Sequence, residues 1–218
     1  LPEVALVDPE LTFDLPPEIT ASTGLHALTQ LVEPFLSLRA NPMTDALCLE
    51  GLRRAAGSLL RAWKEGHDLR AREDMALASL LGGMALANAG LGAVHGLAAP
   101  LGGLRPIPHG AACAALLPHV LAANLRGLRT KAPGGPGLAK FSALARILTG
   151  NPHAEPEDGL AWIRTLTRDL RVRGLGAYGL VSSDLGEIAG RASQATSMQG
   201  NPVELAREEL VDILAEAL

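Results

Sequence analysis

Residues 71–90, AREDMALASLLGGMALANAG, carry apolar or small side chains at nearly every position, and this stretch decides the fold class. A helix that is apolar on all sides is a buried helix. The acidic first turn of the stretch also suits the positive end of a helix dipole. The chain continues from residue 90 as GLGAVHGLAAPLGGLRPIPHGAAC. We therefore predict a buried core helix that ends near His95, a turn-rich loop from Pro100 to Pro108, and a new helix that begins at His109.

The composition of the whole chain also favours an all-α fold. Of its 218 residues, 48% are hydrophobic and only 3% are aromatic, so Leu and Ala must build the core, and both favour helices. We expect seven or eight helices. The first begins at Thr20 or Ser22, the second opens at Thr44, and the last carries Pro202 in its first turn. The other helical stretches are residues 109–128, 138–150, 157–170 and 183–194.

The N-terminus has a different pattern. The apolar run Val4 to Val7 is followed by Asp8 and Pro9, a sequence typical of a strand that leads into a turn. No other segment alternates with a period of two, so this strand is expected to pair within a sheet that precedes the chain. We predict that residues 1–14 are the last strand and linker of a missing domain, and that residues 15–218 form the helical domain.

Charge and cysteine content exclude several classes of partner. The net charge is −4, and there is no long basic run, which argues against binding to nucleic acid. No secretory signal opens the chain, and no uninterrupted apolar run predicts a membrane span. The two cysteines, Cys48 and Cys113, are most simply reduced thiols. We expect a cytoplasmic protein that binds neither membrane nor nucleic acid.

Two of the six histidines stand out. His67 and His153 lie in polar loops, where we expect them to be solvated, and His119 is interpreted as a packing or capping residue. His95 and His109 lie in an apolar segment, and a buried imidazole needs partners for both ring nitrogens. Spacing alone leaves two interpretations open, core histidines or a shared site, and slightly favours core histidines.

The first predicted helix adds more polar groups. In STGLHALTQLVE, residues 22–33, His26, Gln30 and Glu33 follow each other at helical spacing and share one face. This predicts a polar pocket in which His26 and Gln30 meet His95 and His109 around one ion. Imidazoles suit Zn, Fe, Cu or Ni, whereas an amide oxygen is a weaker ligand.

No motif for a dinucleotide is present. GLGAVHG (residues 90–96) and GLGAYG (residues 174–179) are rich in glycine, but neither has the G-x-G-x-x-G spacing between a strand and a helix. The sequence therefore assigns no residue of this chain to cofactor binding.

Several segments together resemble one known family, and the resemblance covers nearly the whole chain. STGLHALTQLVEPF, ANPMTDAL, the long segment of residues 90–124, ILTGNP and QGNP resemble the group III iron-containing alcohol dehydrogenases. The resemblance implies a dehydroquinate-synthase-like arrangement. In it an N-terminal α/β domain binds NAD(P), a helical C-terminal domain holds a divalent metal, and a small alcohol or aldehyde binds between them. This chain is similar to the helical C-terminal domain together with the last strand of the N-terminal α/β domain.

The resemblance also implies a metal site. The family uses one Asp and three His, with the Asp and the first His in T-G-x-D-x-x-x-H. Here those two positions hold His26 and Gln30, whereas His95 and His109 match the remaining ligands. The implied metal residues are therefore His26, Gln30, His95 and His109, and no separate catalytic residue is assigned. Without the carboxylate this neutral set suits Zn or Ni better than Fe, with Glu33 a less favoured source of charge.

Three functions follow from this interpretation. The first is the metal-binding half of an NAD(P)-dependent alcohol dehydrogenase or aldehyde reductase. Its metal ion would polarise the alcohol or carbonyl oxygen. The second is a non-catalytic or decayed helical module, and the third is a metal-independent reductase resembling maleylacetate reductase. An apolar face left for a missing domain would favour a homodimer or association with that N-terminal domain.

Overall fold

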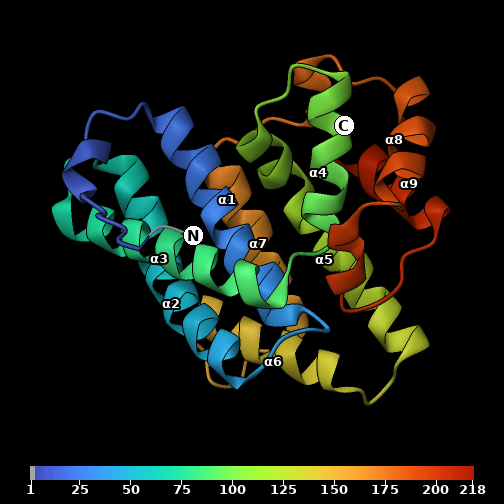
Figure 1. Ribbon diagram of the computed structural model, residues 1–218, viewed down its shortest axis with the longest axis horizontal. Coiled ribbons are helices and arrows are strands. Elements are labelled where there is room, and N and C mark those ends of the chain that lie inside the picture. Colours follow the sequence, from blue (N-terminus) through green and yellow to red (C-terminus); the bar gives the residue numbers. More distant parts are fainter. Residues whose placement is uncertain (1–2) are drawn as a thin grey trace.

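The computed structural model describes residues 3–218, and helices form its architecture (Figure 1). No strand occurs within these residues, which confirms the predicted all-α class. The described chain contains nine α-helices: α1 Pro17–Leu36, α2 Pro42–Lys64, α3 Leu69–Ala89, α4 Ala93–Leu104, α5 His109–Lys131, α6 Pro136–Thr149, α7 Pro156–Asp169, α8 Leu185–Ala192 and α9 Arg207–Glu216. Four 3-10 helices complete it: η1 Pro9–Thr12, η2 Leu175–Tyr178, η3 Ser182–Asp184 and η4 Thr196–Gly200.

Helix α5 occupies the centre of the domain. It packs against α1 on one side and α4 on the other, while α7 and α9 cover further parts of its surface. Helices α1, α2 and α3 form one group at the N-terminal side of the molecule, and α4, α8 and α9 form another at the opposite side (Figure 1). By length and hydropathy α5 qualifies as a membrane span. However, 89% of its most apolar window is buried inside the domain, as in a core helix.

Helix α3 differs from the prediction in its burial. It was predicted to be buried on all sides, but only one face is buried, including Ala78, Gly82 and Ala85. These small residues allow α3 to approach α1 closely: a Cβ added at Gly82 would lie 3.3 Å from the Cβ of Gln30. On the opposite face Met84 is 47% exposed. The core helix that is buried nearly all round is α5.

The segment between α3 and α5 also differs from the prediction. The buried helix does not continue to His95, because α3 ends at Ala89 and the chain turns by 99° into α4. Gly90 makes this turn with φ +72°, a backbone conformation that favours glycine. Helix α4 then runs through Pro100 to Leu104, where a loop was predicted. Pro100 has no backbone N–H, so α4 lacks one hydrogen bond at this position. The packing of α4 on α5 and α8 compensates for this loss.

Three predicted helix starts are wrong by a few residues. Helix α1 begins at Pro17, before Thr20 and Ser22, because proline is well suited to a first turn. Helix α2 begins at Pro42 with Asn41 as its cap, and Thr44 completes the capping box. Helix α9 begins at Arg207, so the segment that contains Pro202 precedes it.

The predicted strand from Val4 to Val7 is not observed. These residues lie in exposed, irregular chain before η1, because an isolated strand has no partner within residues 3–218 to hydrogen-bond to. The division of the chain into residues 1–14 and 15–218 stays a prediction, and residues 1 and 2 lie outside the described structure.

Candidate metal centre

Three histidines from different helices converge at one place. His26 comes from α1, His95 from α4 and His109 from the first residue of α5. The Nε2 atoms of His26 and His95 are 3.1 Å apart, and the three ring centroids are 4.9 to 5.4 Å from one another. His95 is buried, His26 is half-buried and His109 is exposed. The fold therefore unites three of the four predicted site residues, although they span 84 positions of the sequence.

A close helix contact brings His109 to His26. Gly110 follows His109 and packs against the main chain of α1: an added Cβ would lie 2.9 Å from the carbonyl oxygen of Ser22. Any larger side chain at Gly110 would push the start of α5 away from α1. The small residue is thus a geometric requirement for the histidine cluster.

Glu33 fixes the orientation of His95. One carboxylate oxygen of Glu33 lies 2.6 Å from Nδ1 of His95, and the other accepts a 2.7 Å hydrogen bond from the backbone N–H of Val94. The carboxylate therefore accepts a hydrogen bond from the Nδ1–H of His95, and the Nε2 lone pair of His95 is directed at His26. Glu33, considered above as a less favoured source of charge at the ion, acts on the cluster through His95.

A polar network holds the start of α4 in the same region. The side-chain oxygen of Asn201 accepts hydrogen bonds from the backbone N–H of Ala93 and from the amide of Asn124, both at 3.1 Å. Together with Glu33, Asn201 satisfies N–H groups in the first turn of α4 that have no partner within the helix. The segment QGNP, which contains Asn201, thus contributes to positioning His95.

The electrostatics of the cluster favour the neutral forms of His26 and His109. Burial, followed by the neighbouring His95 and His109, lowers the pKa of His26 to about 4. Burial and His95 also lower the pKa of His109. A neutral imidazole has a free nitrogen lone pair, which is the form that binds a metal ion.

Cys113 is a fourth donor that the sequence analysis missed. Its Sγ lies 3.7 Å from Nε2 of His109, and the donor atoms of His26, His95, His109 and Cys113 all lie within 4.8 Å of one another. The signal was present in the sequence, because His109 and Cys113 are four residues apart and therefore share one face of α5. Burial and the nearby Glu33 raise the pKa of this thiol.

Gln30, the remaining predicted ligand, lies one turn after His26 on α1. It is half-buried, and its Cβ and main chain lie against Gly82 of α3. Its amide makes no hydrogen bond with any residue of the described chain. Its predicted role as a ligand stays a prediction.

The other histidines lie away from the cluster. His67 and His153 are exposed, as predicted for solvated residues. His119 lies in the middle of α5, so the capping interpretation is wrong. Its Nδ1 is 3.1 Å from a carboxylate oxygen of Glu216, which links α5 to α9.

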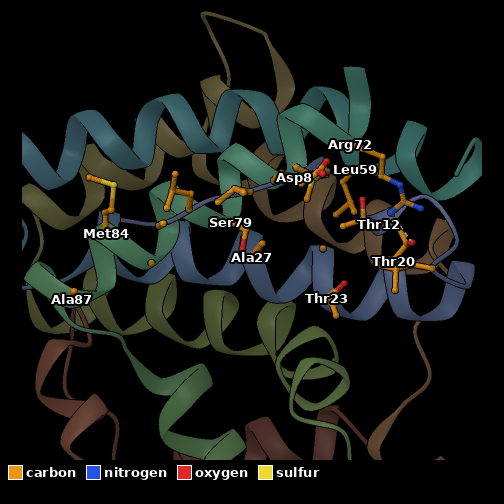
Figure 2. A pocket seen from close by; sticks show the side chains of 18 of the residues that line it. Asp8, Thr12, Thr20, Thr23, Ala27, Leu59, Arg72, Ser79, Met84 and Ala87 are labelled. Atoms are coloured by element: carbon orange, nitrogen blue, oxygen red, sulfur yellow. Dashed lines mark hydrogen bonds between the residues drawn. The ribbon is translucent and has the colours of Figure 1, made fainter. Parts of the chain in front are cut away.

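A pocket of about 950 Å³ lies beside α1 and α3 (Figure 2). Thr23 and Ala27 of α1 line it together with the exposed face of α3 and the segment before α1. The guanidinium of Arg72 lies at one end and donates to the hydroxyl of Thr20 at 3.0 Å. None of the three clustered histidines lines this pocket, so the two features are separate.

Comparisons with known proteins identify the family. The sequence model described as "Fe-containing alcohol dehydrogenase family, C-terminal" matches residues 20–218. Alcohol dehydrogenase 4 of Saccharomyces cerevisiae is 39% identical over 217 residues, which cover 99% of this chain and 55% of that protein. The 1,3-propanediol dehydrogenase of Klebsiella pneumoniae is 37% identical over 223 residues, covering 100% of this chain and 55% of that protein.

Solved structures agree with this result. A crystal structure of 1,3-propanediol oxidoreductase superposes with a TM-score of 0.91 at 37% identity, covering 100% of this chain and 56% of that one. Sulfoacetaldehyde reductase from Bifidobacterium kashiwanohense, solved in complex with NAD+, gives a TM-score of 0.84 at 27% identity and covers 100% and 55%. The chain thus spans about half the length of these relatives. It belongs to the Fe-containing alcohol dehydrogenase family and corresponds to the C-terminal domain of that family.

Proposed function

We propose that this chain is the metal-binding half of an NAD(P)-dependent alcohol dehydrogenase or aldehyde reductase. The observation that carries the proposal is the convergence of His26, His95 and His109, whose ring nitrogens meet within 4.8 Å. The names of the relatives support the substrate class, because they are dehydrogenases of alcohols and of 1,3-propanediol. The substrate is accordingly a small alcohol or aldehyde.

The residues of the cluster have distinct roles in this proposal. A divalent metal ion at this site, whether Fe, Zn or Ni, would supply a Lewis acid for the alcohol or carbonyl oxygen. His26, His95 and His109 would hold the ion, and Glu33 would keep the Nε2 lone pair of His95 directed toward it. Gln30 is either a further ligand or a hydrogen-bond donor to the substrate oxygen.

We propose that the nicotinamide cofactor binds outside this helical domain. NAD(P) supplies the hydride acceptor or donor. The match to about half of each relative, together with the absence of a dinucleotide motif, supports an N-terminal α/β domain as the NAD(P) site. Residues 1–14 would be the last strand and linker of that domain. We further propose a cytoplasmic protein that forms a homodimer or associates with its N-terminal domain.

Metal analysis tests the proposal. The purified chain should contain a stoichiometric divalent metal, and His109→Ala should abolish it. His153→Ala, at an exposed loop position, is the matched control and should keep the metal. An unchanged metal content in His109→Ala would refute the site.

An activity assay separates this proposal from a metal-independent reductase. Oxidation of NAD(P)H by the protein, measured with a panel of small aldehydes, should be lost after chelation and restored by added metal. Full activity after chelation would favour the metal-independent reductase. No turnover even when the N-terminal domain is supplied with this chain would favour a non-catalytic module.

A further inference from the structure

We propose that Cys113 provides the fourth protein ligand of the metal centre, so that this site binds zinc through three histidines and one thiolate. The inference rests on the proposed function, since it concerns the same ion. It departs from the ligand set expected from the resemblance, in which Gln30 was the fourth residue. It also narrows the expected metal from Fe, Zn or Ni to Zn, because a thiolate favours zinc over iron in a site of this kind.

Two of the distances between donor atoms in the cluster fit a tetrahedral zinc ion. With zinc bonds of about 2.05 Å to nitrogen and about 2.3 Å to sulfur, tetrahedral angles place two nitrogens about 3.4 Å apart and nitrogen and sulfur about 3.6 Å apart. The structure has 3.1 Å between Nε2 of His26 and Nε2 of His95. It has 3.7 Å between Sγ of Cys113 and Nε2 of His109. Two edges of the expected tetrahedron are thus already close to their final lengths.

The charge of the ligand set supports the same conclusion. The three histidines are neutral ligands, and His26 occupies the position where the family pattern has an aspartate. A thiolate at Cys113 would restore one negative charge next to the divalent ion. Cys113 is completely buried, and the Glu33 carboxylate that orients His95 is 6% exposed. A buried ion is therefore surrounded by firmly positioned donors on this side.

The fourth ligand does not block substrate. Zinc sites can expand to five-coordinate geometry during a reaction. His95 and Cys113 lie on the buried side of the cluster, whereas His109 is exposed. The solvent side of the cluster next to His109 is therefore left for an alcohol or carbonyl oxygen.

Cobalt substitution tests the thiolate directly. Co²⁺ bound to a thiolate shows a charge-transfer band in the near ultraviolet, in addition to the visible bands of the ion. The wild-type chain loaded with Co²⁺ should show this band, and Cys113→Ser should lose it while keeping the visible bands. Cys48→Ser is the matched control, because Cys48 is equally buried but lies on α2 outside the cluster. Cys48→Ser and Gln30→Leu should both keep the charge-transfer band.

Competition between metals gives a second measurement. Cys113→Ser should lower the affinity for Zn²⁺ by more than the ~10–100-fold loss that is typical of outer-shell substitutions. The affinity for Fe²⁺ should fall less than the affinity for Zn²⁺. A charge-transfer band that persists in Cys113→Ser would overturn the role of Cys113. The proposed function would stand in that case, because cobalt would still be bound at the site. Failure of the wild-type chain to bind any divalent metal would overturn both proposals.

A third measurement needs no variant. X-ray absorption at the zinc edge of the loaded wild-type chain should show one sulfur at about 2.3 Å and nitrogen or oxygen ligands at about 2.0–2.1 Å. A first shell made only of nitrogen and oxygen would overturn the proposal, whatever the folding behaviour of Cys113→Ser.

Discussion

Replacement of Glu33 by glutamine should weaken metal binding although Glu33 is not itself a ligand. Two donors point at its carboxylate: the backbone N–H of Val94 at 2.7 Å and Nδ1 of His95 at 2.6 Å. Glutamine has one acceptor oxygen and one NH₂ group, so it can accept from only one of the two. Since Val94 keeps its N–H, the conflict has two resolutions, and both are unfavourable.

In the first resolution a buried donor loses its acceptor, which lowers the free energy of unfolding by ~1–3 kcal/mol. In the second, the NH₂ group donates to Nδ1 of His95, and the imidazole proton moves to Nε2. That tautomer removes the lone pair directed at His26. Loss of such an outer-shell partner reduces metal affinity by about 10–100-fold. Glu33→Gln should therefore bind metal about 10–100-fold more weakly or unfold more easily.

The assay is a metal titration by calorimetry, paired with urea unfolding of the metal-free chain. Glu216→Gln is the matched control, because Glu216 pairs with His119 at 3.1 Å but is 45% exposed. An exposed pair contributes only ~0–1 kcal/mol, so this variant should behave like the wild type in both measurements. Metal affinity and stability of Glu33→Gln equal to those of Glu216→Gln would refute the reasoning.

Three other predictions concern stability. Gly159→Ala should destabilise the chain by ~1–3 kcal/mol, because the added Cβ would lie 2.8 Å from the backbone of α6. Gly57→Ala should stabilise it by ~0.5–1 kcal/mol, because there is open space around this position of α2. Urea unfolding measures both effects, and reversed signs would contradict the reasoning. Asp68 caps the start of α3. The hydrogen bond from the backbone N–H of Ala71, and then the one from Arg61, lower the pKa of its carboxyl group. The stability advantage of wild type over Asp68→Asn should thus be present at neutral pH and vanish as the pH falls through this lowered pKa, whereas a pH-independent difference would exclude the carboxylate as its source. Added zinc at 100 times its Kd should raise the free energy of unfolding by ~2.7 kcal/mol in the wild type and not in His109→Ala. Thermal melts with and without chelator measure this difference. An equal response of the two proteins would exclude the histidine cluster as the zinc site.

The helical class of the domain follows from composition alone. A core made of Leu and Ala with few aromatic or β-branched residues has little alternative to helices, and each stretch predicted to be helical contains a helix. Helix ends were less predictable, since α4 continues through Pro100 and α1 begins before Thr20. Local signals compete with packing at these ends, and packing between helices cannot be read from one segment of sequence.

Burial of individual helices also required the tertiary structure. Residues 71–90 and residues 109–128 are similarly apolar, yet only α5 lies at the centre of the domain. Helix α3 leaves one face uncovered beside the pocket in Figure 2. Hydrophobicity indicates that a helix can be buried, but the arrangement of its neighbours decides how many of its faces are.

The sequence by itself determined the helical class, the family resemblance, and three histidines as site residues, because motifs and composition are local properties of the chain. The tertiary structure decided that their ring nitrogens meet, that Glu33 orients His95, and that Cys113 lies in the same cluster. The physical reason is distance: these groups lie on three helices, and only the packing of α1, α4 and α5 brings donors so far apart in sequence to within one coordination sphere.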